Sequence, residues 1–221
     1  MANAIPINWQ NIHTVFLDMD GTLLDLHFDN HFWLEHMPKR YAEKHNISIE
    51  RASQELIGKT TEIEGTLDWY CLDYWEQTLE MDIVSLKHEV AERIAVRENV
   101  IEFLDYLRGK GKRVVLLTNA HRKTVDVKFK YVDIEQHFDR IITSHDIGIA
   151  KEQEGFWEAL SKQEEFSREQ SLFIDDNIDV LDTAKRFGIH YLLAISQPDS
   201  KQPVKDTKGY TAVECYTQLT T

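Results

Sequence analysis

Five short apolar runs, each stopped abruptly by polar residues, constrain the fold of this 221-residue chain more than any other feature. A short apolar run that ends in a turn is typical of a strand buried on both faces of a sheet. Helical patterns closed by glycines lie between the later runs. Alternating strands and helices predict a parallel sheet covered by helices. The five runs are residues 14–17, 114–117, 140–143, 172–174 and 191–195.

The chain between the first two runs is too long for a simple crossover. It extends from Asp20 to Val114, whereas a crossover between parallel strands needs about a dozen residues or somewhat more. Residues 26–93 show helical patterns without strand-like alternation. We therefore expect an α/β protein, with a Rossmann-like core formed by residues 1–25 and 94–221 and an inserted helical cap formed by residues 26–93. The helices expected in the cap are residues 32–44, 49–57, 67–79 and 84–94.

The chain is acidic, with 25 Lys and Arg against 38 Asp and Glu and a formal net charge of −13. This charge repels phosphate backbones and anionic bilayers, so we expect neither a nucleic-acid polymer nor a membrane as a partner. Residues 1–10 do not resemble a signal peptide, and no apolar run approaches the roughly 18 to 20 residues of a membrane span. The expected location is the cytoplasm, and the oligomeric state stays open. Cys71 and Cys215 lack metal-ligand spacing, so we expect them to be reduced and without a role.

Pairs of aspartates follow two of the apolar runs, Asp18 and Asp20 after the first and Asp175 and Asp176 after the fourth. The carboxyl ends of parallel strands meet at one edge of a sheet, so these side chains should converge. Four carboxylates in one crevice need protons or a cation among them, and an all-oxygen set suits Mg²⁺. A single strand-end aspartate often only caps a turn or a helix. The Asp-x-Asp-Gly-Thr pattern directly after a buried strand favours a functional site.

Four motifs follow one another along the chain, namely Asp18-Met19-Asp20-Gly21-Thr22, Thr118-Asn119, Lys151 and Asp175-Asp176. Their order resembles the haloacid dehalogenase superfamily over essentially the whole chain. The resemblance implies a Rossmann-like core, a helical cap after the first strand, and Mg²⁺-dependent phosphoryl transfer through an aspartyl-phosphate.

The resemblance implies roles for the four aspartates. Asp18 would be the nucleophile and a metal ligand. Asp20 would act first as general acid and then as general base, with its backbone carbonyl on the metal. Because dehalogenases of the superfamily lack an acid at this position, Asp20 favours phosphate esters as substrates. Asp175 would be the last metal ligand, and Asp176 would hold a water molecule on the metal.

Three further residues match positions that hold the phosphoryl group. The Thr118 hydroxyl and the Asn119 backbone would donate hydrogen bonds to it, and Lys151 would offset its charge and that of Asp18. Many relatives continue the lysine motif with Pro, whereas this chain has Glu152. We therefore expect Lys151 at the start of a helix, where the helix dipole disfavours a cation unless an anion binds nearby.

Two stretches of the expected cap, residues 27–36 and 64–75, resemble the bacterial GMP/IMP nucleotidases more closely. That resemblance implies hydrolysis of purine nucleoside 5′-monophosphates. We expect His27 and Asn30 to contact the substrate. A zinc site at His27 and His31 would lack a third ligand. Aromatic side chains of the cap can stack on a base, but we expect four of them mainly as cap core. These four are Trp69, Tyr70, Tyr74 and Trp75.

Other functions stay open from the sequence. A sugar-phosphate phosphatase or a phosphomutase would use the same aspartates, and a non-enzymatic phospho-receiver would also present an acidic site. A Rossmann dehydrogenase is disfavoured because no Gly-x-Gly-x-x-Gly follows the first strand. We expect the basic residues of one later helix to form a solvated face. They are Arg122, Lys123, Lys128 and Lys130.

Overall fold

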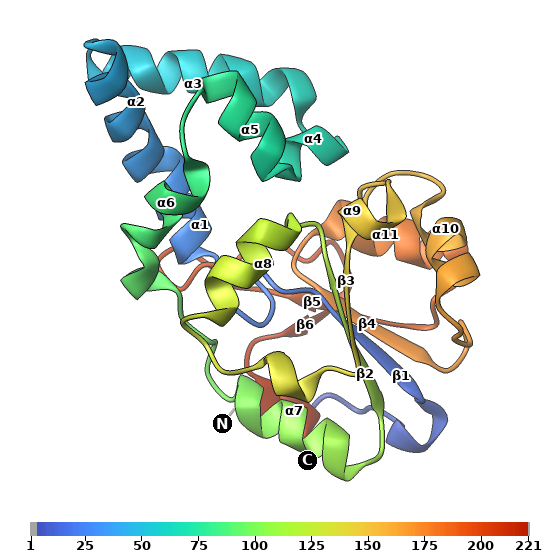
Figure 1. The fold of residues 1–221 in the computed structure, drawn as a ribbon. Helices are drawn as coiled ribbons and strands as arrows, with labels where there is room; N and C mark the ends of the chain where they lie inside the picture. Colours follow the sequence, from blue (N-terminus) through green and yellow to red (C-terminus); the bar gives the residue numbers. More distant parts are fainter. Residues whose placement is uncertain (1–3, 221) are drawn as a thin grey trace.

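A six-stranded parallel sheet lies at the centre of the chain in the computed structural model, which describes residues 4–220 (Figure 1). Residues 1–3 and 221, at the two ends of the expected core, lie outside the described part. The strand order is β3-β2-β1-β4-β5-β6, and every neighbouring pair is parallel. The predicted α/β class is thus confirmed. The strands are β1 (Thr14–Leu17), β2 (Arg113–Thr118), β3 (Arg140–Thr143), β4 (Ser171–Asp175), β5 (Tyr191–Ile195) and β6 (Thr211–Val213).

β1 occupies the middle of the sheet, between β2 and β4. Phe16 pairs in register with Val115 on one side and with Phe173 on the other. The carboxyl ends of these three strands are therefore adjacent, at the edge where ligands of open α/β sheets bind. β6 was not expected, because it is only three residues long and half exposed at the sheet edge.

Alternate residues of β1 enter two different cores, one on each face of the sheet. Val15 and Leu17 join the larger cluster, and Phe16 joins the smaller one. The larger cluster packs against α7 (Val100–Gly109) and α8 (Arg122–Phe129). The smaller cluster packs against α10 (Phe156–Gln163) and α11 (Ile178–Phe187). Short elements complete this part of the chain, namely η1 (Trp9–Asn11), η4 (Glu135–His137), α9 (Ser144–Ile147) and η5 (Tyr216–Leu219).

The helices of residues 26–93 stand together over the carboxyl ends of the strands, beside α8 (Figure 1). The first begins at His27, earlier than expected, and its axis continues through a π-helical turn, η2, into α2. The expected helix 67–79 is divided at Cys71, whose backbone is extended. The elements are α1 (His27–His31), η2 (Phe32–His36), α2 (Met37–His45), α3 (Ile49–Ile63), α4 (Leu67–Tyr70), α5 (Leu72–Leu79), α6 (Ile83–His88) and η3 (Ala91–Arg93).

Two short segments connect these helices to the sheet, and they lie side by side. Leu24 and Val96 form an isolated antiparallel bridge. The Asp25 N–H donates to the Ala95 carbonyl, and the Arg97 N–H donates to the Leu23 carbonyl, each at 2.9 Å. The insertion therefore leaves and rejoins the core at one place.

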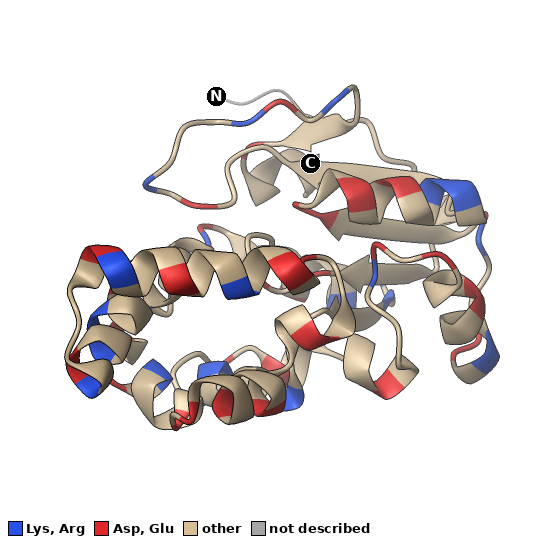
Figure 2. Cartoon of the chain, turned by 90° about the horizontal axis from the view of Figure 1, so that it is seen from above, with Lys and Arg blue, Asp and Glu red and all other residues tan. Residues whose placement is uncertain are grey.

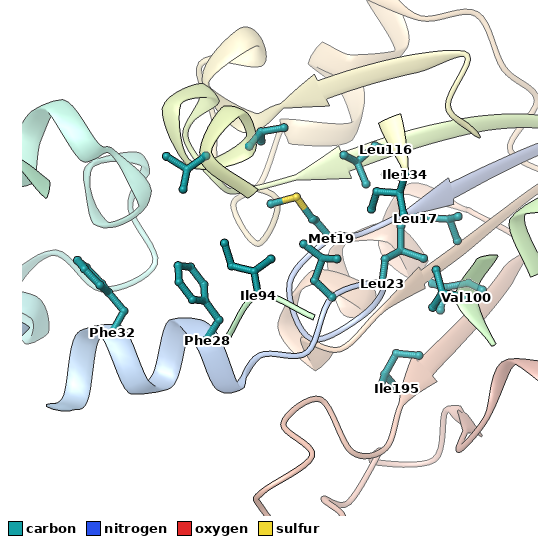
Figure 3. Close-up of a cluster of buried hydrophobic side chains, with 14 of the residues drawn as sticks. Leu17, Met19, Leu23, Phe28, Phe32, Ile94, Val100, Leu116, Ile134 and Ile195 are labelled. Carbon is teal, nitrogen blue, oxygen red and sulfur yellow. The ribbon is translucent and has the colours of Figure 1, made fainter. Parts of the chain in front are cut away.

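Apolar side chains form a continuous cluster from the sheet to the first inserted helix (Figure 3). Leu17 of β1 is followed by Met19 and Leu23 in the turn and by Phe28 and Phe32 beyond it, all at most 1% exposed. Burying a large apolar side chain is worth about 1.5–3 kcal/mol. This cluster holds α1 firmly against the end of β1.

Charged residues of both signs are interspersed over the helices (Figure 2). Within residues 4–220, no helix is long and apolar enough to cross a bilayer.

Candidate functional site

The predicted acidic residues meet at the carboxyl end of the sheet. Asp18 follows β1 directly, and its N–H donates to the Ile174 carbonyl of β4 at 3.0 Å. Asp175 is the last residue of β4, and Asp176 follows it. Carboxylate oxygens of Asp18, Asp175 and Asp176 all lie within 4.8 Å of one another. The sequence-based expectation that the two pairs converge therefore agrees with the geometry for three of the four aspartates, and the Asp20 carboxylate is not in this group.

Lys151 compensates part of this negative charge. Its Nζ donates to Asp18 Oδ1 and Asp175 Oδ2, both at 2.7 Å, and to the Leu117 carbonyl at 3.1 Å. Burial alone would lower the pKa of the lysine, but attraction to Asp175 and Asp18 outweighs burial and raises that pKa. Lys151 is thus a permanent cation between the two strand ends.

Burial dominates the electrostatics of the carboxylates themselves. It raises the pKa of Asp18, Asp175 and Asp176 to about 6 each, against the attraction of Lys151 for the first two and of Lys205 for the third. Among residues 4–220, none offers a hydrogen-bond partner to the buried oxygen Asp18 Oδ2. Two lysines, Lys151 and Lys205, therefore leave these three carboxylates with a formal charge of −1, and one buried carboxylate oxygen has no hydrogen-bond partner among the described residues.

Asp20 has a different environment, although it lies only two residues from Asp18. Its carboxylate accepts a hydrogen bond from Lys128 Nζ. The same Nζ donates to Asp29 Oδ2 at 2.5 Å, and Lys87 Nζ donates to Asp29 Oδ1 at 3.2 Å. Burial raises the pKa of Asp20 to about 6, and the Lys128 charge opposes this shift.

The expectation that Lys128 lies on a solvated helix face is therefore wrong. Its side chain is 1% exposed, because α1 and α6 cover this side of α8 and bring Asp29 and Lys87 against it. Two buried lysines and two partly buried aspartates form a network in which the formal charges cancel. The residues are Asp20, Asp29, Lys87 and Lys128.

Gly21 makes the sharp turn after Asp20 and has little space around it. Its φ of +80° is a conformation that L side chains rarely adopt. A Cβ at this position would lie 2.9 Å from Asp176 Cγ and 2.9 Å from Pro198 Cβ. The glycine of the motif thus lets the backbone after β1 approach the carboxylate after β4.

Lys151 does not begin a helix, in contrast to the expectation. Residues 151–154 form turns, and α10 begins at Phe156 after Gly155, whose φ is +86°. Asn119 fixes this turn, because its Oδ1 accepts a hydrogen bond from the Lys151 N–H at 2.9 Å. The ammonium group therefore does not belong to the first turn of α10.

Glu152, which replaces the Pro of many relatives, links the sheet to the inserted helices. Asn119 Nδ2 donates to Glu152 Oε2 at 2.8 Å, and the Tyr70 hydroxyl of α4 donates to Glu152 Oε1 at 2.7 Å. Burial, and then the charge of Glu152, raise the pKa of Tyr70, so the hydroxyl stays protonated as a donor. The sequence shows that Glu stands at this position in place of Pro, but it does not show that Tyr70 and Asn119 bind this Glu.

A cavity of about 730 Å³ lies between these residues and the inserted helices. The acidic cluster, Thr118, Asn119 and Lys151 line its floor, and the Thr118 hydroxyl also accepts the Ala120 N–H at 3.0 Å. Aromatic and aliphatic residues line the other side, namely Trp33, Leu56, Ile57, Trp69, Tyr70 and Trp75. Such a volume and lining are typical of small-molecule sites.

The two substrate contacts predicted in the cap lie at different places. Asn30 lines the cavity, and its Nδ2 donates to Asp199 Oδ2 at 2.7 Å. The described residues that line the cavity do not include His27, whose Nδ1 lies 3.6 Å from Asp199 Oδ1. Neither His27 nor His31 belongs to a group of potential metal ligands within residues 4–220.

Comparisons with known proteins identify the family. A family profile described as a haloacid dehalogenase-like hydrolase matches residues 12–188, which include every motif residue at the floor of the cavity. The chain belongs to the haloacid dehalogenase-like hydrolases. The GMP/IMP nucleotidase YrfG of Escherichia coli (strain K12) is 38% identical over 215 residues, which cover 97% of each protein. The protein of the same name from Shigella flexneri matches equally well.

Solved structures of haloacid dehalogenase-like proteins share the fold. The HAD phosphatase from Thermococcus onnurineus superposes with a TM-score of 0.73 and 18% identity, over 94% of this chain and 95% of that one. A structure described as a putative beta-phosphoglucomutase from Thermotoga maritima gives a TM-score of 0.64 and 16% identity, over 95% and 97%. Both matches extend over the sheet and the inserted helices.

Proposed function

We propose that this haloacid dehalogenase-like hydrolase is a phosphatase that releases phosphate from purine nucleoside 5′-monophosphates, with GMP and IMP as its substrates. The observation that carries the proposal is the buried, unpartnered Asp18 Oδ2 at the floor of a cavity with an aromatic opposite wall. The similarity to the GMP/IMP nucleotidase of Escherichia coli, which extends over 97% of both chains, supports the substrate class. In this proposal residues 26–93 act as a cap over a core formed by residues 1–25 and 94–221.

The acidic cluster fits a divalent cation with oxygen ligands. Three carboxylates face two lysines, Lys151 and Lys205, and one buried oxygen has no hydrogen-bond partner among residues 4–220. We assign Mg²⁺ to Asp18, Asp175 and the Asp20 backbone carbonyl, with Asp176 holding a water molecule on the ion. When bound, Mg²⁺ would neutralise charge on the phosphoryl oxygens and on the nucleophile.

In the first step Asp18 Oδ2 attacks phosphorus and the bond from phosphorus to the ester oxygen breaks. Phosphoryl transfer depends on positioning and on neutralising the equatorial oxygens. Lys151, fixed by Asn119 and by its bonds to Asp18 and Asp175, supplies a permanent positive charge there. The Thr118 hydroxyl, which lines the same floor, donates a hydrogen bond to the phosphoryl group.

Asp20 handles the protons in both steps. Burial raises its pKa to about 6, which brings it toward the range in which a carboxyl group can act as a general acid. It protonates the leaving nucleoside oxygen in the first step. In the second step it accepts a proton from the water molecule that attacks phosphorus in the aspartyl-phosphate, which restores Asp18 and releases inorganic phosphate.

The aromatic wall of the cavity would bind the base. Trp33, Trp69 and Tyr70 line the cavity and remain partly exposed, whereas Trp75 is 1% exposed and packs in the core. The expectation that the aromatic residues form mainly cap core therefore fits Trp75 better than Trp69 and Tyr70. Stacking of a base on an aromatic ring is worth about 1–3 kcal/mol.

A phosphate-release screen tests the proposal. The panel contains GMP, IMP, AMP, several sugar phosphates and para-nitrophenyl phosphate, each with Mg²⁺ and with EDTA. We expect GMP and IMP to be hydrolysed far faster than the others, and EDTA to abolish turnover. Equal rates across the panel would contradict the substrate class, and transfer of phosphate to a sugar without release would indicate a phosphomutase.

Two substitutions test the mechanism in the same assay. Asp18→Asn removes the nucleophile and should abolish turnover while the protein stays folded. Asp105→Asn makes the same chemical change on α7, where the side chain is 62% exposed, and should leave the rate unchanged. Turnover retained by Asp18→Asn would refute the aspartyl-phosphate mechanism.

A further inference from the structure

A second group of potential metal ligands lies apart from the aspartates. One ligand atom each of Cys71, His121 and His145 lies within 4.8 Å of the other two. Cys71 separates α4 from α5, His121 precedes α8 after β2, and His145 belongs to α9 after β3. Three segments that are distant in sequence thus bring a thiol and two imidazoles together.

The two imidazoles have unused nitrogen atoms. His145 Nδ1 and Nε2 and His121 Nδ1 are buried without a hydrogen-bond partner among residues 4–220. A buried polar atom without a partner costs about 1–3 kcal/mol, and native proteins usually satisfy such atoms. Burial lowers the pKa of both histidines, so both rings are neutral near pH 7 and have a lone pair for a metal ion.

A carboxylate lies near one nitrogen of His121. Asp73 Oδ2 is 3.8 Å from His121 Nε2, longer than a hydrogen bond, and Nδ1 is the buried nitrogen without a hydrogen-bond partner among the described residues. A metal-binding histidine usually has a carboxylate near its second nitrogen, and this partner fixes the tautomer. The unpartnered nitrogen of His121 is therefore the one that a metal ion would need.

We propose that Cys71, His121 and His145 bind a borderline-soft divalent ion of the Zn²⁺ class, which ties the inserted helices to the loops after β2 and β3. Thiolate and imidazole ligands suit Zn²⁺ and Co²⁺, whereas the oxygen cluster at Asp18 suits Mg²⁺. Tetrahedral Zn²⁺ places its S and N ligands about 3.3 to 3.6 Å apart. Side-chain rotations that shorten the separations, which are at most 4.8 Å, by no more than about 1.5 Å complete the site, and binding releases the thiol proton of Cys71 to solvent.

Cobalt provides a spectroscopic test that is independent of activity. The full chain is stripped with EDTA, dialysed, kept reduced with a phosphine and titrated with Co²⁺ in excess Mg²⁺. We expect one equivalent to produce a near-ultraviolet thiolate-to-cobalt band with intense visible bands of tetrahedral Co²⁺, and Zn²⁺ to remove both. Binding only at the aspartates would give no thiolate band and would overturn the proposal.

Matched variants locate the ligands. Cys71→Ser should abolish the thiolate band, whereas Cys215→Ser, which changes the other partly buried free cysteine, should keep it. His145→Asn should weaken Co²⁺ binding at least about 100-fold, and Asp73→Asn about 10- to 100-fold. The reverse pattern for the two cysteines would refute the site.

Amide hydrogen exchange tests the tie between segments. Zn²⁺ should slow exchange in residues 67–79 of the wild-type protein, because the ion holds Cys71 against His121 and His145. Cys71→Ser, with its unfolding temperature checked to show that it folds, should not respond to Zn²⁺. Equal responses of the two proteins would overturn the assignment of Cys71.

Discussion

Lys128→Met tests whether the buried charges around Asp20 act as one network. The substitution leaves Asp20 and Asp29 facing Lys87 alone, so the formal charge of the group changes from zero to −1. Lys128 is 1% exposed and contacts both carboxylates. Removing one partner of a buried ion pair costs about 3–5 kcal/mol, and we expect the free energy of unfolding to fall by that amount.

The charge count also predicts a rescue. Adding Asp29→Asn to Lys128→Met restores a formal charge of zero, so the double variant should be more stable than the two single effects together would predict. We expect an interaction free energy of about 2 kcal/mol, as for residues of one ion-pair network.

Urea unfolding followed by tryptophan fluorescence measures each variant, with the slope m checked for constancy. Lys123→Met is the control. This lysine lies on the same helix but is 44% exposed, with partners Asp73 and Glu76 at 2.6 and 2.7 Å. Lys123→Met should lower the free energy of unfolding by no more than about 1 kcal/mol. Additive effects of Lys128→Met and Asp29→Asn would refute the network.

Three further substitutions test the turn, the cavity and the link between them. Gly21→Ala should lower the free energy of unfolding by about 1–3 kcal/mol, because residue 21 has a positive φ. It should also slow phosphate release, because the new Cβ displaces Asp176. Urea unfolding checks the first effect, and turnover at saturating substrate checks the second. Trp69→Leu should raise the KM for GMP about tenfold through lost stacking. It should leave the KM for a sugar phosphate, which has no aromatic ring, unaffected, and an equal change for both would contradict base contact. Tyr70→Phe removes the 2.7 Å hydrogen bond to Glu152 and should lower the free energy of unfolding by about 1–2 kcal/mol. Thermal unfolding measures this effect, and an unchanged unfolding temperature would argue against the link.

Local patterns predicted the sheet and the floor of the site well. Asp18 and Asp175 end buried strands, and the parallel topology then requires their side chains to meet. β6 escaped prediction because three half-exposed residues carry no periodicity. The turn at Lys151 was also mispredicted, because Asn119 stabilises it from another strand end.

Contacts between distant segments could not be predicted in the same way. The spacing of lysines on α8 indicates a helix face, but only the packing of α1 and α6 buries Lys128. Cys71, His121 and His145 share no local motif, since each lies on a different segment. The burial of a polar side chain depends on what covers it, and this information is spread over the whole chain.

The bridge between Leu24 and Val96 makes the insertion a module with a closed base. Two backbone hydrogen bonds hold its entry and exit segments together, independently of the helices beyond them. A foreign segment whose ends meet at the same spacing can therefore be grafted between these positions, provided that it replaces the charges of Asp29 and Lys87 beside Asp20 and Lys128. Such chimaeras would give the same reaction centre new substrates, and the junctions for building them are already present in the backbone.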